Sequence, residues 1–157
     1  MTDDEKTGTF LVTAADDDSA VLADVDDGQV HTLATNPGVE TGDAVEGTVA
    51  PEPPLEVAWR LVDVAEQWSI SVEESSEAPT THEREIAAEG AVGELTKRER
   101  AGTGEIHVLT VPESETEAAV ADVLDDEDGL RSRAARLGVE RVVVRSEPGV
   151  VSVRYLP

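Results

Sequence analysis

The sequence predicts an α+β protein, with a small antiparallel β-barrel in its N-terminal half and helices layered over a short sheet in its C-terminal half. Up to residue 74, short segments rich in Val, Leu and Thr alternate with polar residues between tight turns, which is typical of strands. Beyond that point apolar residues recur at helical spacing. We therefore expect a barrel domain at 1–74, a linker at 75–82 and an α+β domain at 83–157.

The barrel half is expected to contain five or six strands. Asp27 and Gly28 are a favourable pair for a two-residue hairpin turn, because Gly accepts positive φ and Asp tolerates it. Pro51, Pro53 and Pro54 then interrupt the pattern, since proline cannot donate to a ladder. A closed or nearly closed barrel follows, because closure removes exposed strand edges. The expected strands are 7–15, 19–25, 29–34 and 43–50, with two more within 55–74.

Capping signals place the helices of the C-terminal half. Thr80 and Glu83 form a capping box that opens a helix running to about residue 89, and Thr96 begins the same pattern for a second short helix. Ser114 is the expected cap of a third helix, and Gly138 ends a fourth. The element order is then helix, helix, strand, helix, helix, strand, strand. Its strands are 104–112, 139–147 and 150–157, the last two forming a hairpin.

Negative charge dominates the composition. The chain carries 35 acidic and 12 basic residues, a formal charge of −23, and only Lys6 and Lys97 are lysines. The Debye length falls from about 10 Å at about 0.1 M salt to about 3 Å at about 1 M, so concentrated salt removes most of the self-repulsion. This pattern predicts a protein of a salt-rich cytoplasm that needs high K⁺ to fold. The alternative is an acidic disordered tail, but the acids are dispersed among alternating apolar residues, with the aspartates of 12–30 at expected hairpin tips.

Several functional classes receive no support. The absence of Cys excludes disulfides, thiol nucleophiles and Cys-based zinc sites. His31, His82 and His107 lie in separate segments, and "DVDDG" does not have the spacing of a calcium loop. We therefore expect no catalytic residue, no metal and no cofactor, although a catalytic carboxylate pair could be hidden by the acidic background. No apolar run reaches the roughly 20 residues of a membrane helix, and "MTDDEKTG" differs from a secretory signal, so we expect no membrane contact and a cytoplasmic location.

The stretch "GDAVEGTV" at 42–49 resembles the strand entry of small translation-type barrels of the OB and SH3-like kinds. That resemblance implies nucleic-acid binding through a basic groove and aromatic stacking residues. Residues 1–78, however, carry nineteen acidic and two basic side chains, a formal −17 that repels phosphate. Trp59 and Trp68 are candidate partner contacts, with core packing as the alternative interpretation.

A group of arginines near the C-terminus is the candidate anion or nucleic-acid site. Arg141, Val143 and Arg145 share one face of the expected strand, and Arg154 joins that face across the hairpin. Arginine suits phosphate because its donors form a planar fork. The alternative is pairing with nearby acids, worth about 0–1 kcal/mol per surface pair. The full candidate set is Arg131, Arg133, Arg136, Arg141, Arg145 and Arg154.

Over nearly its full length the chain resembles a haloarchaeal family of unknown function. The stretches that carry the resemblance are "KTGTFLVT", "VDDGQVHTL", "VAPEPPLEV", "GEIHVLTVP" and "VVSVRYLP". The resemblance implies salt adaptation and a two-part layout, and implies no activity. We expect a non-catalytic adaptor that holds a protein partner, with an RNA or nucleotide binder that uses the hairpin arginines as the alternative.

The charge analysis predicts that folding depends on salt. Dialysis from concentrated KCl to low ionic strength should abolish the far-UV circular dichroism of strands and helices, because unscreened carboxylates repel one another. An unchanged spectrum at low ionic strength would contradict the salt-adaptation argument.

Overall fold

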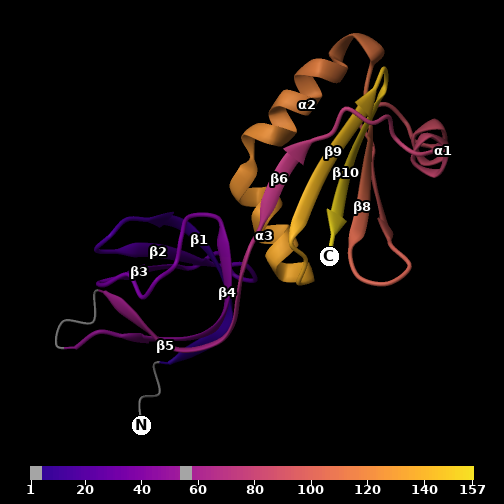
Figure 1. Ribbon diagram of the computed structural model, residues 1–157. Helices are drawn as coiled ribbons and strands as arrows, with labels where there is room; N and C mark the ends of the chain where they lie inside the picture. The colour runs from indigo at the N-terminus through magenta and orange to yellow at the C-terminus, as the bar shows by residue number, and fades with distance from the viewer. Residues whose placement is uncertain (1–4, 54–57) are drawn as a thin grey trace.

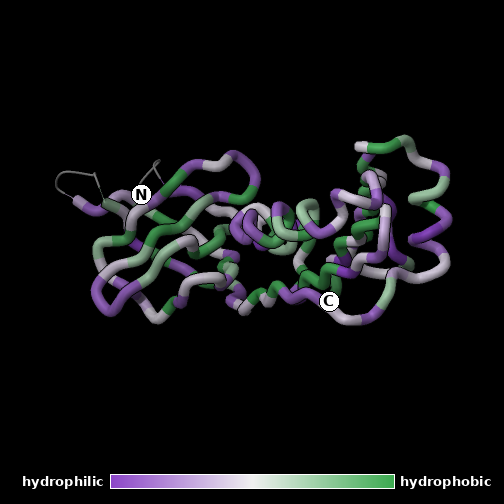
Figure 2. The backbone as a smooth tube through the Cα atoms, turned by 90° about the horizontal axis from the view of Figure 1, so that it is seen from above, coloured by the Kyte–Doolittle hydropathy of each residue, from purple (hydrophilic) through white to green (hydrophobic). Residues whose placement is uncertain are grey.

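The computed structural model describes residues 5–53 and 58–157, so Pro54 and the first four residues of the N-terminal stretch lie outside the described residues. It contains a closed five-stranded barrel and a separate five-stranded sheet with three α-helices (Figure 1). The predicted α+β class is confirmed. Seen from above, the barrel and the α+β part lie at opposite ends of an elongated molecule (Figure 2).

The barrel closes in the strand order β1-β2-β3-β5-β4. All its pairings are antiparallel except that of β3 with β5, which is parallel and joins Leu33 to Trp59. The expectation of a purely antiparallel barrel is therefore wrong, because β5 runs antiparallel to β4 but closes against β3 in the same direction. Its strands are β1 (Lys6–Ala15), β2 (Ala20–Asp24), β3 (Val30–Leu33), β4 (Asp43–Pro51) and β5 (Trp59–Ser69).

Two aspartates of the barrel are structural and are not solvated at hairpin tips. Asp24 is only 5% exposed, accepts hydrogen bonds from the backbone N–H groups of Asp26 and Asp27, and lies 3.1 Å from Lys6 Nζ. The β2–β3 connection is consequently a loop over 25–29, with Gly28 at φ +77°, instead of the expected two-residue turn. Asp43 accepts hydrogen bonds from the side chains of β5 and is also buried.

The second sheet has the order β6-β9-β10-β8-β7. β6 pairs in parallel with β9, so residues 71–74 extend this sheet and not the barrel. The short helix expected after Thr96 is instead β7, because this segment forms a ladder with β8 in which Leu95 lies opposite Leu109. The strands are β6 (Ser71–Glu74), β7 (Leu95–Glu99), β8 (Glu105–Thr110), β9 (Arg141–Glu147) and β10 (Val150–Leu156).

Three helices cover the sheet. The predicted capping box of Thr80 and Glu83 is confirmed for α1 (Thr81–Glu89), and Gly138 ends α3 (Glu127–Leu137) at φ +73°. α2 (Thr116–Asp125) follows a 3₁₀ turn, η1 (Glu113–Glu115), so Ser114 is not its cap. α2 and α3 lie on one face of the sheet, and α1 lies on the other (Figure 1).

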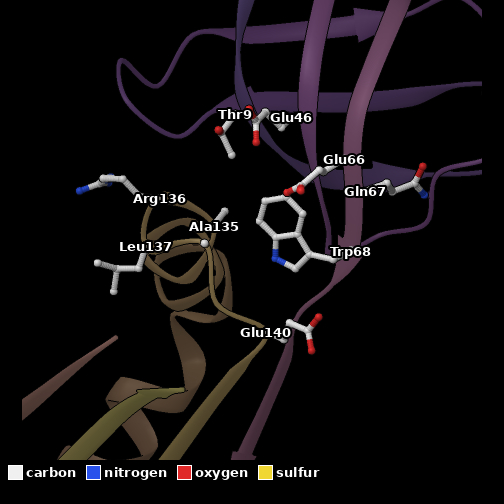
Figure 3. A pocket seen from close by; sticks show the side chains of 10 residues that line it. Thr9, Glu46, Glu66, Gln67, Trp68, Ala135, Arg136, Leu137 and Glu140 are labelled. Carbon is white, nitrogen blue, oxygen red and sulfur yellow. The ribbon is translucent and has the colours of Figure 1, made fainter. Parts of the chain in front are cut away.

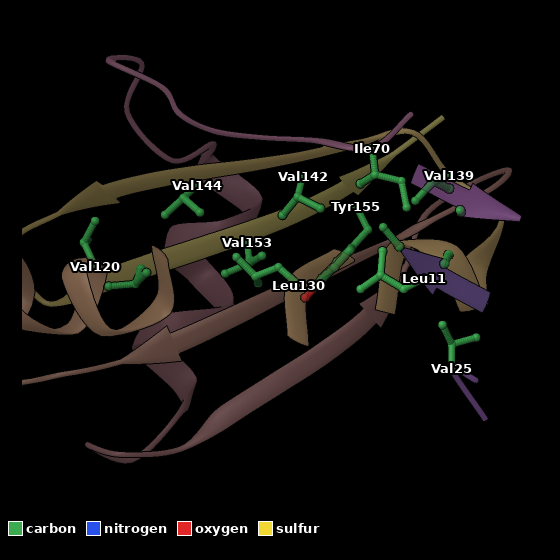
Figure 4. Packing of buried hydrophobic residues seen from close by; sticks show 14 residues of the cluster. Leu11, Val25, Ile70, Val120, Leu130, Val139, Val142, Val144, Val153 and Tyr155 are labelled. Carbon is green, nitrogen blue, oxygen red and sulfur yellow. The ribbon is translucent and has the colours of Figure 1, made fainter. Parts of the chain in front are cut away.

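α3 joins the two halves through one apolar cluster. Leu130, Ala134 and Ala135 of α3 pack with Leu11 and Ala44 of the barrel and with the inner face of the second sheet (Figure 4). The small alanines allow the helix to lie close to β1. A separate cluster around Phe10 fills the barrel, and a third lies beneath α1. Among the described residues, no helix is long and apolar enough to cross a membrane.

His31 gives the barrel a pH dependence. Its ring is fully buried against Phe10 and Trp59, and neither ring nitrogen has a hydrogen-bond partner among the described residues. Burial, followed by repulsion from Lys6, lowers the pKa of His31 below its usual 6.5. The unfolded chain therefore binds a proton more readily than the folded chain does.

We predict that the free energy of unfolding is fully maintained above pH 6.5, the ordinary pKa of His, and falls as the pH drops toward the lowered pKa of folded His31. His31→Leu should reduce this slope in urea unfolding series at constant KCl. A smaller slope should remain, because burial also lowers the pKa of His107. Identical slopes for the variant and the parent would refute this role for His31.

Candidate functional site

A cleft of about 540 Å³ lies where the barrel meets the C-terminal end of α3 (Figure 3). Thr9, Glu46 and Glu66 line it from β1, β4 and β5, while Trp68 stands beside them near the end of β5. The opposite wall is formed by residues 135–138 and 140. Its position between two packed bodies is a common one for binding sites.

The barrel wall of this junction cleft places two like charges side by side. The strand register puts Thr9 opposite Glu46, and Glu46 directly opposite Glu66. Both glutamates are exposed, and no residue within 5–53 or 58–157 forms an ion pair with either of them. Like charges directly opposite each other destabilise a strand pair, and a cation between them would relieve the repulsion.

The helical wall adds further negative potential. Gly138 adopts the left-handed conformation, and its N–H donates to the carbonyls of Ala134 and Ala135 at the C-terminus of α3. A helix C-terminus carries the negative end of the macrodipole. Glu140, two residues after Gly138, also lines the cleft. Both walls of the junction cleft therefore favour a positively charged group.

The two tryptophans have different places. The indole Nε1 of Trp68 donates a 3.1 Å hydrogen bond to the carbonyl of Val139, so this side chain both lines the cleft and ties the barrel to the second part. In Figure 3 its ring lies between the barrel strands and α3, close to Glu66. Trp59 instead packs against the barrel cluster and His31.

The three arginines of α3 are held by separate contacts. Arg131 donates to the carbonyl of Ile70 and to Glu127, and Arg133 forms a 2.7 Å ion pair with Glu105. Arg136 Nε donates to the carbonyl of Val25 at the edge of the junction cleft. In Figure 3 the Arg136 guanidinium is directed away from the carboxylates, so it leaves the negative wall open.

The arginines of the β9–β10 hairpin lie on the other face of the sheet from α3. Arg154 is paired with Val143, which places it on the same face as Arg141 and Arg145. Arg141 pairs with Glu73 at 3.1 Å, and Arg145 pairs with Glu77 at 2.7 Å. The six candidate arginines therefore form two groups and not one continuous strip.

Arg154 is the least well neutralised of the hairpin group. Its Nε lies 3.9 Å from Glu83 Oε2 and has no hydrogen-bond partner among the described residues. Burial, followed by the nearby charge of Arg145, lowers the pKa of Arg154. Glu83 is fully buried, accepts a hydrogen bond from the Ser152 hydroxyl and also completes the cap of α1, so this cluster anchors a helix.

The glutamates of the junction cleft were not among the residues singled out from the sequence. Their local pattern is the same as that of many other acids in this chain, and only the pairing of β4 with β5 brings Glu46 and Glu66 together. Three or more His, Cys, Asp or Glu side chains do not converge on a metal-sized site anywhere in the described part of the chain.

The chain belongs to the family of unknown function DUF5812, which it matches over residues 6–146. No curated protein and no solved structure is significantly similar to it.

Trp68 should stabilise the junction through its indole N–H. Trp68→Phe keeps an aromatic ring but leaves the Val139 carbonyl without this donor, and we expect the free energy of unfolding to fall by about 1 kcal/mol. Urea unfolding in concentrated KCl measures the change. An unaltered unfolding midpoint would show that the hydrogen bond contributes nothing to the junction.

Proposed function

We propose that this protein is a non-catalytic, salt-adapted binding protein that holds a protein partner, and that the partner places a Lys or Arg side chain in the junction cleft. The observation that carries the proposal is the pairing of Glu46 with Glu66 beside Trp68, in a cleft that Glu140 and the C-terminus of α3 also line. The carboxylates of Glu46, Glu66 and Glu140 and the C-terminus of α3 thus line the same junction cleft.

A basic side chain fits each part of this surface. Its charge reduces the repulsion between Glu46 and Glu66, and its apolar stem packs against the indole of Trp68. A cation over an aromatic face gains about 0.5–2 kcal/mol, depending on its desolvation. The cleft volume of about 540 Å³ lies within the range of about 300–1,000 Å³ found for ligand pockets.

Salt adaptation explains why contact matters more than overall charge. A formal charge of −23 would attract any cation in dilute buffer. At about 1 M salt the screening length is about 3 Å, so only charges in direct contact discriminate between partners. The proposal includes a cytoplasmic location in a salt-rich cell, as the resemblance to haloarchaeal proteins implies.

Binding of RNA or a nucleotide by Arg141, Arg145 and Arg154 is the alternative. The five-stranded barrel has the strand number of the OB-fold, which often binds nucleic acid. Two of these arginines already pair with Glu73 and Glu77, however, and a phosphate would have to displace those carboxylates. For this reason we favour the junction cleft.

Affinity capture in concentrated KCl tests the proposal. We compare the parent chain with the cleft variant Glu46→Gln/Glu66→Gln/Glu140→Gln. The control variant, Glu85→Gln/Glu89→Gln/Glu99→Gln, removes the same charge from exposed positions outside the cleft. The parent and the control should each retain one companion protein in stoichiometric amount. The cleft variant should retain about tenfold less of that companion, since several contact ion pairs are removed.

Two outcomes would count against the cleft. One is equal recovery by the cleft and control variants, and the other is repeated recovery of no companion by the parent. A parallel RNA-retention assay at moderate salt tests the alternative. Retention that is lost in Arg141→Ala/Arg145→Ala/Arg154→Ala, but kept in the cleft variant, would favour the hairpin instead.

A further inference from the structure

A second hollow, of about 340 Å³, lies on the α2/α3 face of the second sheet. α2 and α3 pack over β9 and β10, and the hollow lies beside them over β8 and the edge strand β7. The opposite face of β8 is covered by α1. We call this hollow the sheet groove; it is separate from the junction cleft, with which it shares no lining residue.

The floor of the sheet groove is apolar. Leu95, Leu109 and Val151 form one row across β7, β8 and β10. Val123 of α2 and Leu130 of α3 close the helical side. This surface suits a compact apolar group and offers little to a fully polar ligand.

One largely buried side chain presents its hydroxyl to the groove without a hydrogen-bond partner in the described part of the chain. Tyr155 is only 4% exposed and lines the groove, yet its hydroxyl makes no hydrogen bond with any residue in the described ranges. In Figure 4 the hydroxyl oxygen is directed toward Leu130, another groove residue. Burial raises the pKa of Tyr155 to about 12, so the group remains a neutral hydroxyl.

The neighbouring polar residues are already paired. His107 is 7% exposed, its ring centroid lies 4.9 Å from that of Tyr155, and its Nε2 lies 2.9 Å from Glu105. Glu105 also binds Arg133 at 2.7 Å, which neutralises that guanidinium. Burial lowers the pKa of His107, so the ring is neutral near pH 7. This wall is fixed and carries no free charge.

The helical rim is negative. Asp122 and Asp126 line the groove from α2 and from the α2–α3 joint, and both are exposed. Asp126 also accepts a hydrogen bond from the N–H of Gly129. Lys97 lies on β7, across the groove from this rim, and is paired in the ladder with His107. A ligand cation is therefore drawn to the helical side, away from Lys97.

We propose that the sheet groove binds a small amphiphilic amine, with its apolar body on Leu95 and Leu109, its ammonium at Asp122 and Asp126, and a hydrogen bond to the Tyr155 hydroxyl. Concentrated salt screens the remote charges of the chain over about 3 Å, so the rim carboxylates select the cation by contact. This inference does not depend on the junction cleft and fails or stands separately from it.

The chain offers a direct reporter, since Tyr155 is its single tyrosine. Protein labelled with fluorotyrosine gives one fluorine NMR resonance, at the groove itself. We titrate it in concentrated KCl with three probes that share a phenyl body: phenethylammonium, phenethyl alcohol and hydrocinnamate. The resonance should shift saturably with the ammonium, more weakly with the alcohol and not with the carboxylate.

A pair of matched variants separates rim contact from overall charge. Asp122→Asn removes one rim carboxylate that forms no hydrogen bond with any described residue, whereas Asp126→Asn would also disturb the start of α3. Asp63→Asn makes the same charge change on an exposed barrel position. Asp122→Asn should raise the Kd of phenethylammonium by about fivefold, the loss of one ion pair, and Asp63→Asn should leave it unchanged.

Three results would overturn the proposal. The first is the absence of a saturable shift with phenethylammonium. The second is equal affinity for the three probes, which would indicate non-specific hydrophobic contact. The third is an equal effect of the two variants, which would indicate attraction to the overall charge. The affinity-capture variants of the junction cleft leave the sheet groove intact, so the two experiments fail independently.

Discussion

The packing of α3 against two β-structures at once is the constraint on which the rest of the molecule depends. Leu130, Ala134 and Ala135 belong to the cluster that contains both Leu11 of the barrel and Val142 of the second sheet. The cluster contains residues of both halves, and α3 lies between the barrel and the second sheet and packs against each of them. Side-chain hydrogen bonds from the Trp68 indole to the Val139 carbonyl and from Arg136 to the Val25 carbonyl then fix the helix relative to the barrel. The two halves are consequently joined by a shared hydrophobic cluster, beside the separate cluster that fills the barrel.

Both candidate sites follow from the length of this helix. Its C-terminal residues, ending at Gly138, form a wall of the junction cleft, and Leu130, nearer its N-terminus, closes the sheet groove. An α-helix rises about 1.5 Å per residue, so these two positions are roughly 12 Å apart along the axis. A single rigid element thus sets the geometry of two hollows with different chemistry. The cleft has an acidic wall, whereas the groove has an apolar floor and an acidic rim.

Local signals in the sequence predict most helices and strands, but they do not predict which distant strands pair with one another. The capping box of Thr80 and the terminal Gly138 were predicted because each acts within a few residues. The sequence predicts a helix where the structure has β7, because the capping pattern at Thr96 is local and the ladder with β8 is not. The same limit applies to the site: Trp68 could be singled out, but the opposition of Glu46 and Glu66 exists only through strand register. In the sequence, Glu46 and Glu66 cannot be distinguished from the many other acidic residues.

The acidic background can nevertheless be divided by what each carboxylate contacts. Asp24, Asp43 and Glu83 are buried and satisfied by hydrogen bonds, so they stabilise loops and a helix start. Others, such as Asp27, Glu73 and Glu77, are exposed and form ion pairs with Lys or Arg. Glu46 and Glu66 fit neither group, because they are exposed yet held opposite each other by the barrel. Wherever concentrated salt screens remote charges, such enforced proximity is the arrangement through which carboxylates retain selectivity for a cation. The position of an acid, and not the number of acids, is therefore what can carry function in this chain.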